Sequence, residues 1–240
     1  MVPRRALVGA LAFTMVVPTV ITWLYFLALN DRPSSYQQVA YVAGKLVQFG
    51  FPIAWVLWVE RERPRWSRKV SKRGLALGFL FGGAVASAMF GLYFGYLRPS
   101  GFFDEPAMAV RRRIASIGLT SVWTYRLVAV FYALGHSFLE EYYWRWFVFR
   151  RWQQLVPLTG AVIASSLGFM AHHVLVLAQY FGWSSPTTWL FAGAVAVGGA
   201  CWAWLYHVTQ SLWVPWIGHC LIDAAIFVIG YDLARELIRA

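Results

Sequence analysis

The chain alternates long apolar runs with short polar connections. A helix needs about twenty apolar residues to cross roughly 30 Å of hydrocarbon, and seven runs approach that length. They are Ala6–Leu29, Tyr41–Val59, Gly74–Leu97, Gly118–Leu139, Leu158–Phe181, Thr187–His207 and Leu212–Gly230. Because backbone groups inside hydrocarbon must bond to one another, the runs predict helices rather than open strands. We predict an all-α, polytopic transmembrane helix bundle.

Basic residues predict the orientation of the first crossings. The amino terminus and the loop Glu60–Arg73, which contains seven Lys and Arg residues, are expected in the cytoplasm. A third crossing then places Arg111–Arg113 outside, against the rule. The stretch Asp104–Ile117 is therefore an interfacial amphipathic helix, or one apolar run is a re-entrant hairpin. The predicted number of crossings stays at seven or eight.

Composition supports a membrane protein and argues against nucleic acid as a partner. The sequence is 60% hydrophobic and 13% charged, whereas about 25% charged residues are usual in soluble domains. The formal net charge is +11, but short loops carry much of it, so contact with a lipid bilayer explains it. We predict one membrane-embedded domain over residues 1–240, in a bacterial inner membrane. Cys201 and Cys220 are isolated and are expected to pack.

Acidic residues inside apolar spans are costly and are usually functional. Three stand out, namely Glu140 and Glu141 at the end of one run and Asp223 within the last. These acids and most of the histidines fall in three separate segments between residues 135 and 230. Such a pattern predicts helices that converge on one buried polar site.

The first segment contains two adjacent carboxylates with different expected partners. Glu141 and Arg145 are four residues apart on a helix, so they can form an ion pair. Glu140 points about 100° away from that pair. A carboxyl buried outside an ion pair is suited to act as a general base near neutral pH. The alternative is a charged cluster that caps a span at the interface.

The other two segments supply histidines. In the second, His172 and His173 are adjacent and face different sides of a helix. In the third, His219 and Asp223 are four residues apart and share a face, so the carboxylate can fix the histidine tautomer. Each segment has a structural alternative, in which its polar groups only hydrogen-bond between helices.

The three motifs together resemble the CAAX protease and bacteriocin-processing (CPBP) family, which includes the Ras-converting CAAX endopeptidases. They are Glu140-Glu141-x-x-x-Arg145, Phe169-x-x-x-His173 and His219-x-x-x-Asp223. The resemblance covers about residues 135–230. Asp223 stands where the family often has Asn, and Asp also occurs there.

The resemblance implies an intramembrane endopeptidase of the glutamate type without a cofactor. Glu140 would activate water, His173 would hold it, and His219 with Asp223 would polarise the scissile carbonyl. Glu141 and Arg145 would position the site. His172 is then expected to face a neighbouring helix or backbone, away from Glu140. The substrate would be a peptide or a membrane-anchored protein.

Three alternatives stay open. Two histidines and two carboxylates (Glu140, His173, His219 and Asp223) also make a plausible zinc set, which would give a metalloprotease. The chain could instead be a non-catalytic immunity or scaffold protein. It could also be a proton-coupled carrier that uses Glu140 and His173 as a relay. No HExxH sequence supports a zincin.

Overall fold

The computed structural model describes residues 2–64 and 70–238. The chain divides into two compact units, Met1–Arg68 with Glu140–Leu212 and Lys69–Leu139 with Trp213–Ala240. Within the described residues, all assigned elements are helices. They are either α-helices or the wider π-helices, which are labelled η. The all-α prediction is confirmed, and the single membrane-embedded domain stays a prediction.

The first unit combines four long helical runs with a shorter buried one. Its elements are α1 (Arg4–Trp23), η1 (Leu24–Ala28), α2 (Ser34–Ala54), η2 (Trp55–Glu60), η5 (Tyr142–Phe149), α7 (Arg150–Trp152), α8 (Leu158–Phe181) and α9 (Pro186–Thr209). Pro157 directly precedes α8, and Gly182 ends it with a φ of +83° that suits glycine. All eight side chains of η5 are buried, so η5 forms the core of this unit.

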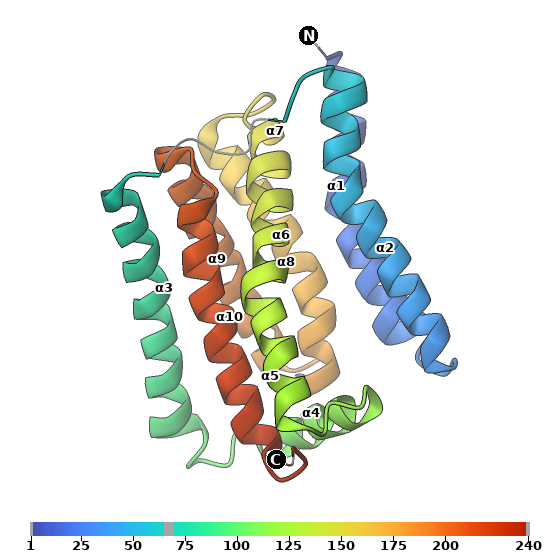
Figure 1. The fold of residues 1–240 in the computed structure, drawn as a ribbon, viewed down its shortest axis with the longest axis vertical. Coiled ribbons are helices and arrows are strands. Elements are labelled where there is room, and N and C mark those ends of the chain that lie inside the picture. The colour runs from blue at the N-terminus through green and yellow to red at the C-terminus, as the bar shows by residue number, and fades with distance from the viewer. Residues whose placement is uncertain (1, 65–69, 239–240) are drawn as a thin grey trace. The chain divides into compact units, whose positions relative to one another are not determined.

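The second unit contains the remaining helices, apart from α6 (Ser137–Glu141), which crosses the boundary between the units. They are α3 (Lys72–Leu92), η3 (Tyr93–Leu97), α4 (Asp104–Ser116), α5 (Val122–Val130), η4 (Phe131–His136) and α10 (Trp213–Ala234). Helices α3 and α10 lie side by side (Figure 1). A Cβ atom on Gly82 would lie 2.7 Å from the Gly218 Cα atom. Small residues therefore permit this close approach, as is common between helices in membranes.

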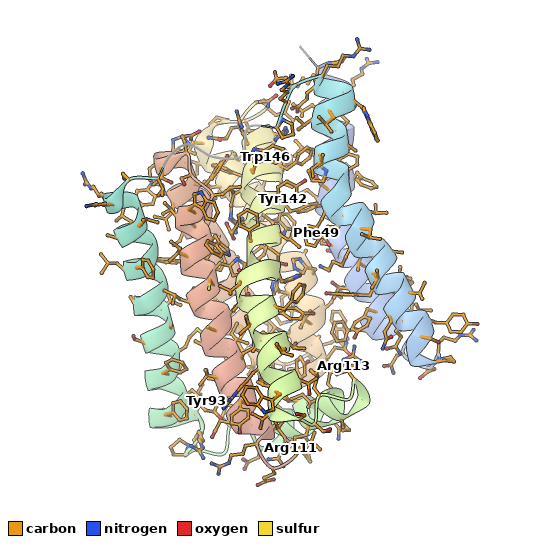
Figure 2. All side chains as sticks on the ribbon, in the orientation of Figure 1. Phe49, Tyr93, Arg111, Arg113, Tyr142 and Trp146 are labelled. Atoms are coloured by element: carbon orange, nitrogen blue, oxygen red, sulfur yellow. The ribbon has the colours of Figure 1, made fainter. Side chains whose placement is uncertain are left out.

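Arg111, which conflicts with the expected orientation, has a structural role within the second unit. Its Nε atom donates a hydrogen bond to the Leu233 carbonyl near the end of α10 at 3.0 Å. Its Nη1 atom lies 3.3 Å from Glu236. An arginine at the carboxyl end of a helix can donate hydrogen bonds to the last carbonyl groups, and its positive charge interacts favourably with the helix dipole. Figure 2 labels Arg111 beside this end of the unit. Residues Asp104–Ser116 are helical (α4), as one of the two alternatives expected, and the position of this helix at the membrane interface stays a prediction.

Six helices within the described residues are long and apolar enough to cross a membrane. They are Arg4–Ala28, Ser35–Glu60, Lys72–Leu97, Leu158–Phe181, Pro186–Thr209 and Trp213–Ala234. They correspond to six of the seven predicted runs. The seventh, Gly118–Leu139, is helical from Val122 but is not among them. Arg126 and His136 interrupt its apolar sequence. The structure therefore supplies six such helices where we predicted seven or eight crossings.

Candidate active site

Glu141 and Arg145 form the predicted ion pair inside the first unit. The Arg145 Nε atom donates to Glu141 Oε2 at 3.0 Å, and both side chains have no exposed surface. The guanidinium also lies over the rings of Phe169 and Trp202, at 5.2 and 5.7 Å from their centroids. These rings and the carboxylate stabilise a buried cation that would otherwise be costly. The prediction that the two residues neutralise each other is confirmed.

Glu140 lies beside a histidine of the second motif. Its Oε1 atom is 3.6 Å from His172 Nε2, and the two side chains are only 5% and 7% exposed. This contact corrects the sequence reading, which placed His172 away from Glu140. Helix geometry predicts the angular offset between His172 and His173, but it does not predict how α8 is rotated about its own axis. The carboxylate and the imidazole are close enough to share a proton or a bridging water.

Aromatic packing holds the His172 ring in place. The ring is parallel to the indole of Trp144, with an interplanar angle of 4° and centroids 6.0 Å apart. It also meets Phe169 edge to face. Gly168 leaves room for this arrangement, because a Cβ atom there would lie 2.9 Å from the Trp144 ring. The orientation of His172 toward Glu140 therefore depends on the packing between η5 and α8.

His173 is fixed by a bond to its own helix. Its Nδ1 atom lies 2.8 Å from the Phe169 carbonyl oxygen. A carbonyl oxygen only accepts, so Nδ1 carries the hydrogen, and in the neutral ring Nε2 keeps its lone pair. The ring centroids of His172 and His173 are 4.1 Å apart. The water-holding role of His173 stays a prediction.

His219 and Asp223 share one face of α10, as predicted. The His219 Nε2 atom lies 3.6 Å from Asp223 Oδ1, and both side chains are largely buried. They belong to the second unit, whereas Glu140 and both histidines of the second motif belong to the first. The predicted joint action of the three motifs therefore stays a prediction.

Lys45 is a charged residue of the first unit that the sequence reading missed. It lies on α2, where its Nζ atom donates to Gln48 Oε1 at 3.1 Å, and it interacts electrostatically with Glu140. Gln48 is fully buried. The next turn of α2 contacts the residues that follow Glu141, since the Tyr142 hydroxyl donates to the Phe49 carbonyl at 3.0 Å (Figure 2). The sequence did contain a signal for Lys45, because a lysine within an apolar span is usually functional.

The zinc alternative requires several metal-binding side chains to lie close together. Within the described residues, no group of three or more His, Cys, Asp or Glu side chains is arranged to hold a metal ion. The proposed zinc set draws two ligands from each unit, so this finding concerns each unit alone. That the protein works without a metal therefore stays a prediction.

Comparison with known proteins gives one match. Residues 121–225 match the family described as "Type II CAAX prenyl endopeptidase Rce1-like". The matched segment, somewhat less than half of the chain, contains all six predicted site residues. No match was found among curated proteins or among solved structures. The apolar helices and this segment identify an integral, multi-pass membrane protein. Over residues 121–225, the chain is thus similar to the Rce1-like CAAX endopeptidases.

Proposed function

We propose that this protein is an intramembrane endopeptidase that cleaves membrane-associated proteins or peptides, with Glu140 as the base that activates water. The observation that carries the proposal is the buried contact between Glu140 and His172, inside the Rce1-like segment. The neighbouring carboxylate, Glu141, is bound to Arg145. The two adjacent acids thus have different environments, which supports different roles.

The proposed reaction is hydrolysis of a peptide bond. Glu140 takes a proton from a water molecule, and the water oxygen attacks the carbonyl carbon of the scissile bond. The tetrahedral intermediate collapses as the carbon–nitrogen bond breaks, and the proton passes from Glu140 to the leaving nitrogen. General acid–base assistance of this kind typically contributes about 10²–10⁴-fold to the rate. The products are a new carboxyl terminus and a new amine.

The histidines have distinct proposed tasks. His172 holds the Glu140 carboxylate in place, and the Nε2 atom of His173 accepts a hydrogen bond from the attacking water. His219, with Asp223 fixing its tautomer, donates to the developing oxyanion. Preorganised donors of that type are usually worth a few kcal/mol in the transition state. For His219 and Asp223 the support is the sequence motif and their contact on α10.

The proposed substrates are peptides or membrane-anchored proteins with a cleavage site near the bilayer. The proposed location is a bacterial inner membrane, with the amino terminus in the cytoplasm, as the basic residues indicate. The proposed mechanism uses no cofactor.

Hydrolysis in isotopically labelled water tests the proposal. The protein is reconstituted in lipid nanodiscs with a set of lipid-anchored, fluorescence-quenched peptides in H₂¹⁸O. Cleaved peptides are expected to carry ¹⁸O in the new carboxyl group. The matched control is Glu105→Gln, an exposed acid on α4, which should cleave at the wild-type rate. Folded protein that cleaves none of the peptides, or that yields unlabelled products, would contradict hydrolysis.

A further inference from the structure

The first unit contains a cavity that the proposed reaction does not use. Its volume is about 820 Å³, within the range of small-molecule sites. The walls come from the start of α1, from the end of η2 with the residues after it, and from the end of η5 with α7. Five arginines line it, namely Arg4, Arg61, Arg63, Arg150 and Arg151.

One wall of the cavity is a fixed ion pair. The buried Arg151 guanidinium donates to both carboxylate oxygens of Glu60, at 3.1 and 2.8 Å, and to the Trp146 carbonyl at 2.9 Å. It also lies 4.2 Å from the centroid of the Phe147 ring. Burial lowers the pKa of Arg151, and the hydrogen bonds and charge of Glu60 raise it. Arg151 and Glu60 therefore satisfy each other and shape the wall.

The remaining charges leave the cavity strongly positive. Glu62 is the other acid in the lining. Within the part of the chain that the structure describes, Arg4, Arg61 and Arg63 form no ion pair, and all three are exposed. Arg61 ends η2 in a left-handed backbone conformation with a φ of 55°, which is common where a helix stops.

The mostly polar lining of the cavity also includes apolar side chains. Leu7, Val56 and Trp146 are almost fully buried there. The cavity lies where the helix Ser35–Glu60 ends and where the helix Arg4–Ala28 begins, so it lies at the end of two candidate membrane spans. A cationic lining at the end of a membrane span lies where the phosphate groups of phospholipids are found.

We propose that this cavity binds the phosphate headgroup of an anionic phospholipid, with Arg4, Arg61 and Arg63 as the phosphate ligands. Guanidinium groups suit phosphate because their paired N–H donors match two phosphate oxygens. The net positive charge of the lining selects an anionic lipid over a zwitterionic one. The position at the end of two candidate membrane spans favours a lipid over free phosphate. The inference is independent of the proposed peptidase activity.

The test measures thermal unfolding of the detergent-solubilised protein with three probes. Short-chain phosphatidylglycerol is expected to raise the unfolding temperature, whereas short-chain phosphatidylcholine and inorganic phosphate at equal concentrations are not. The triple variant Arg4→Gln/Arg61→Gln/Arg63→Gln should bind phosphatidylglycerol at least about tenfold more weakly, since three charge-assisted donors are lost. The control Arg32→Gln/Lys72→Gln/Arg73→Gln removes the same charge outside the lining and should bind like the wild type.

A second variant keeps the proposal testable if the triple variant folds poorly. Glu62→Gln removes the second acid of the lining and should bind phosphatidylglycerol a few-fold more tightly, because like charge no longer opposes the phosphate. Equal weakening in the triple variant and in its control would overturn the site, as would an equal response to phosphatidylcholine. A shift produced by inorganic phosphate alone would overturn the lipid as the ligand.

Discussion

The Nε2 atom of His172 lies 3.6 Å from the Oε1 atom of Glu140, with both side chains buried. We predict that His172→Phe lowers peptide turnover on the order of 100-fold, because a carboxylate that loses its neighbour is displaced from the reacting water. Phenylalanine keeps the ring that stacks on Trp144, so the unfolding temperature should change little. The measurement is the initial cleavage rate together with thermal unfolding. Wild-type turnover in a folded His172→Phe protein would remove His172 from the site.

The buried pair of Glu141 and Arg145 gives a prediction about stability. Glu141→Gln leaves the Arg145 cation without its carboxylate in a fully buried position. Breaking such a pair typically lowers the free energy of unfolding by about 3–5 kcal/mol. Denaturant unfolding in detergent measures this change. The double variant Glu141→Gln/Arg145→Met should recover part of the loss. A change below about 1 kcal/mol in the single variant would contradict the structural role of the pair.

Much of the fold followed from patterns within single helices. The apolar runs located six helices, and a spacing of four residues located the pairs Glu141–Arg145 and His219–Asp223. Both kinds of signal depend only on the local geometry of the helix.

Contacts between helices could not be predicted in this way. The position of His172 beside Glu140 depends on how α8 is rotated against η5, and the contacts of Trp144 with His172 and Gly168 are part of that packing. Lys45 was missed because its interaction with Glu140 joins residues from separate helices. The π-helical form of Tyr142–Phe149 also had no signal in the apolar pattern.

Lys45 gives a prediction about pH dependence. A cation near a carboxylate favours its ionised form, so its removal makes protonation of the carboxylate easier. We predict that Lys45→Met moves the acidic limb of the pH–rate profile to higher pH, whereas Lys45→Arg leaves it in place. The profile of kcat/KM against pH measures the shift. An unchanged acidic limb in Lys45→Met would show that Lys45 does not act on the base.

Metal dependence separates the proposed mechanism, in which Glu140 is the base, from the zinc alternative. We predict that EDTA leaves most of the peptidase activity intact, because a carboxylate base requires no metal. The measurement combines activity after chelation with elemental analysis of the purified protein. Stoichiometric zinc that is lost together with activity, and that restores activity on return, would instead establish Glu140, His173, His219 and Asp223 as candidates for a zinc set.

The most direct test of the central claim is the rate of peptide cleavage by Glu140→Gln in nanodiscs, compared with Glu105→Gln and the wild type. Glutamine has nearly the same shape as glutamate but cannot accept a proton from water. The account predicts loss of turnover by a factor on the order of 10²–10⁴, with an unfolding temperature close to that of the wild type. Substantial turnover in a folded Glu140→Gln protein would contradict Glu140 as the base.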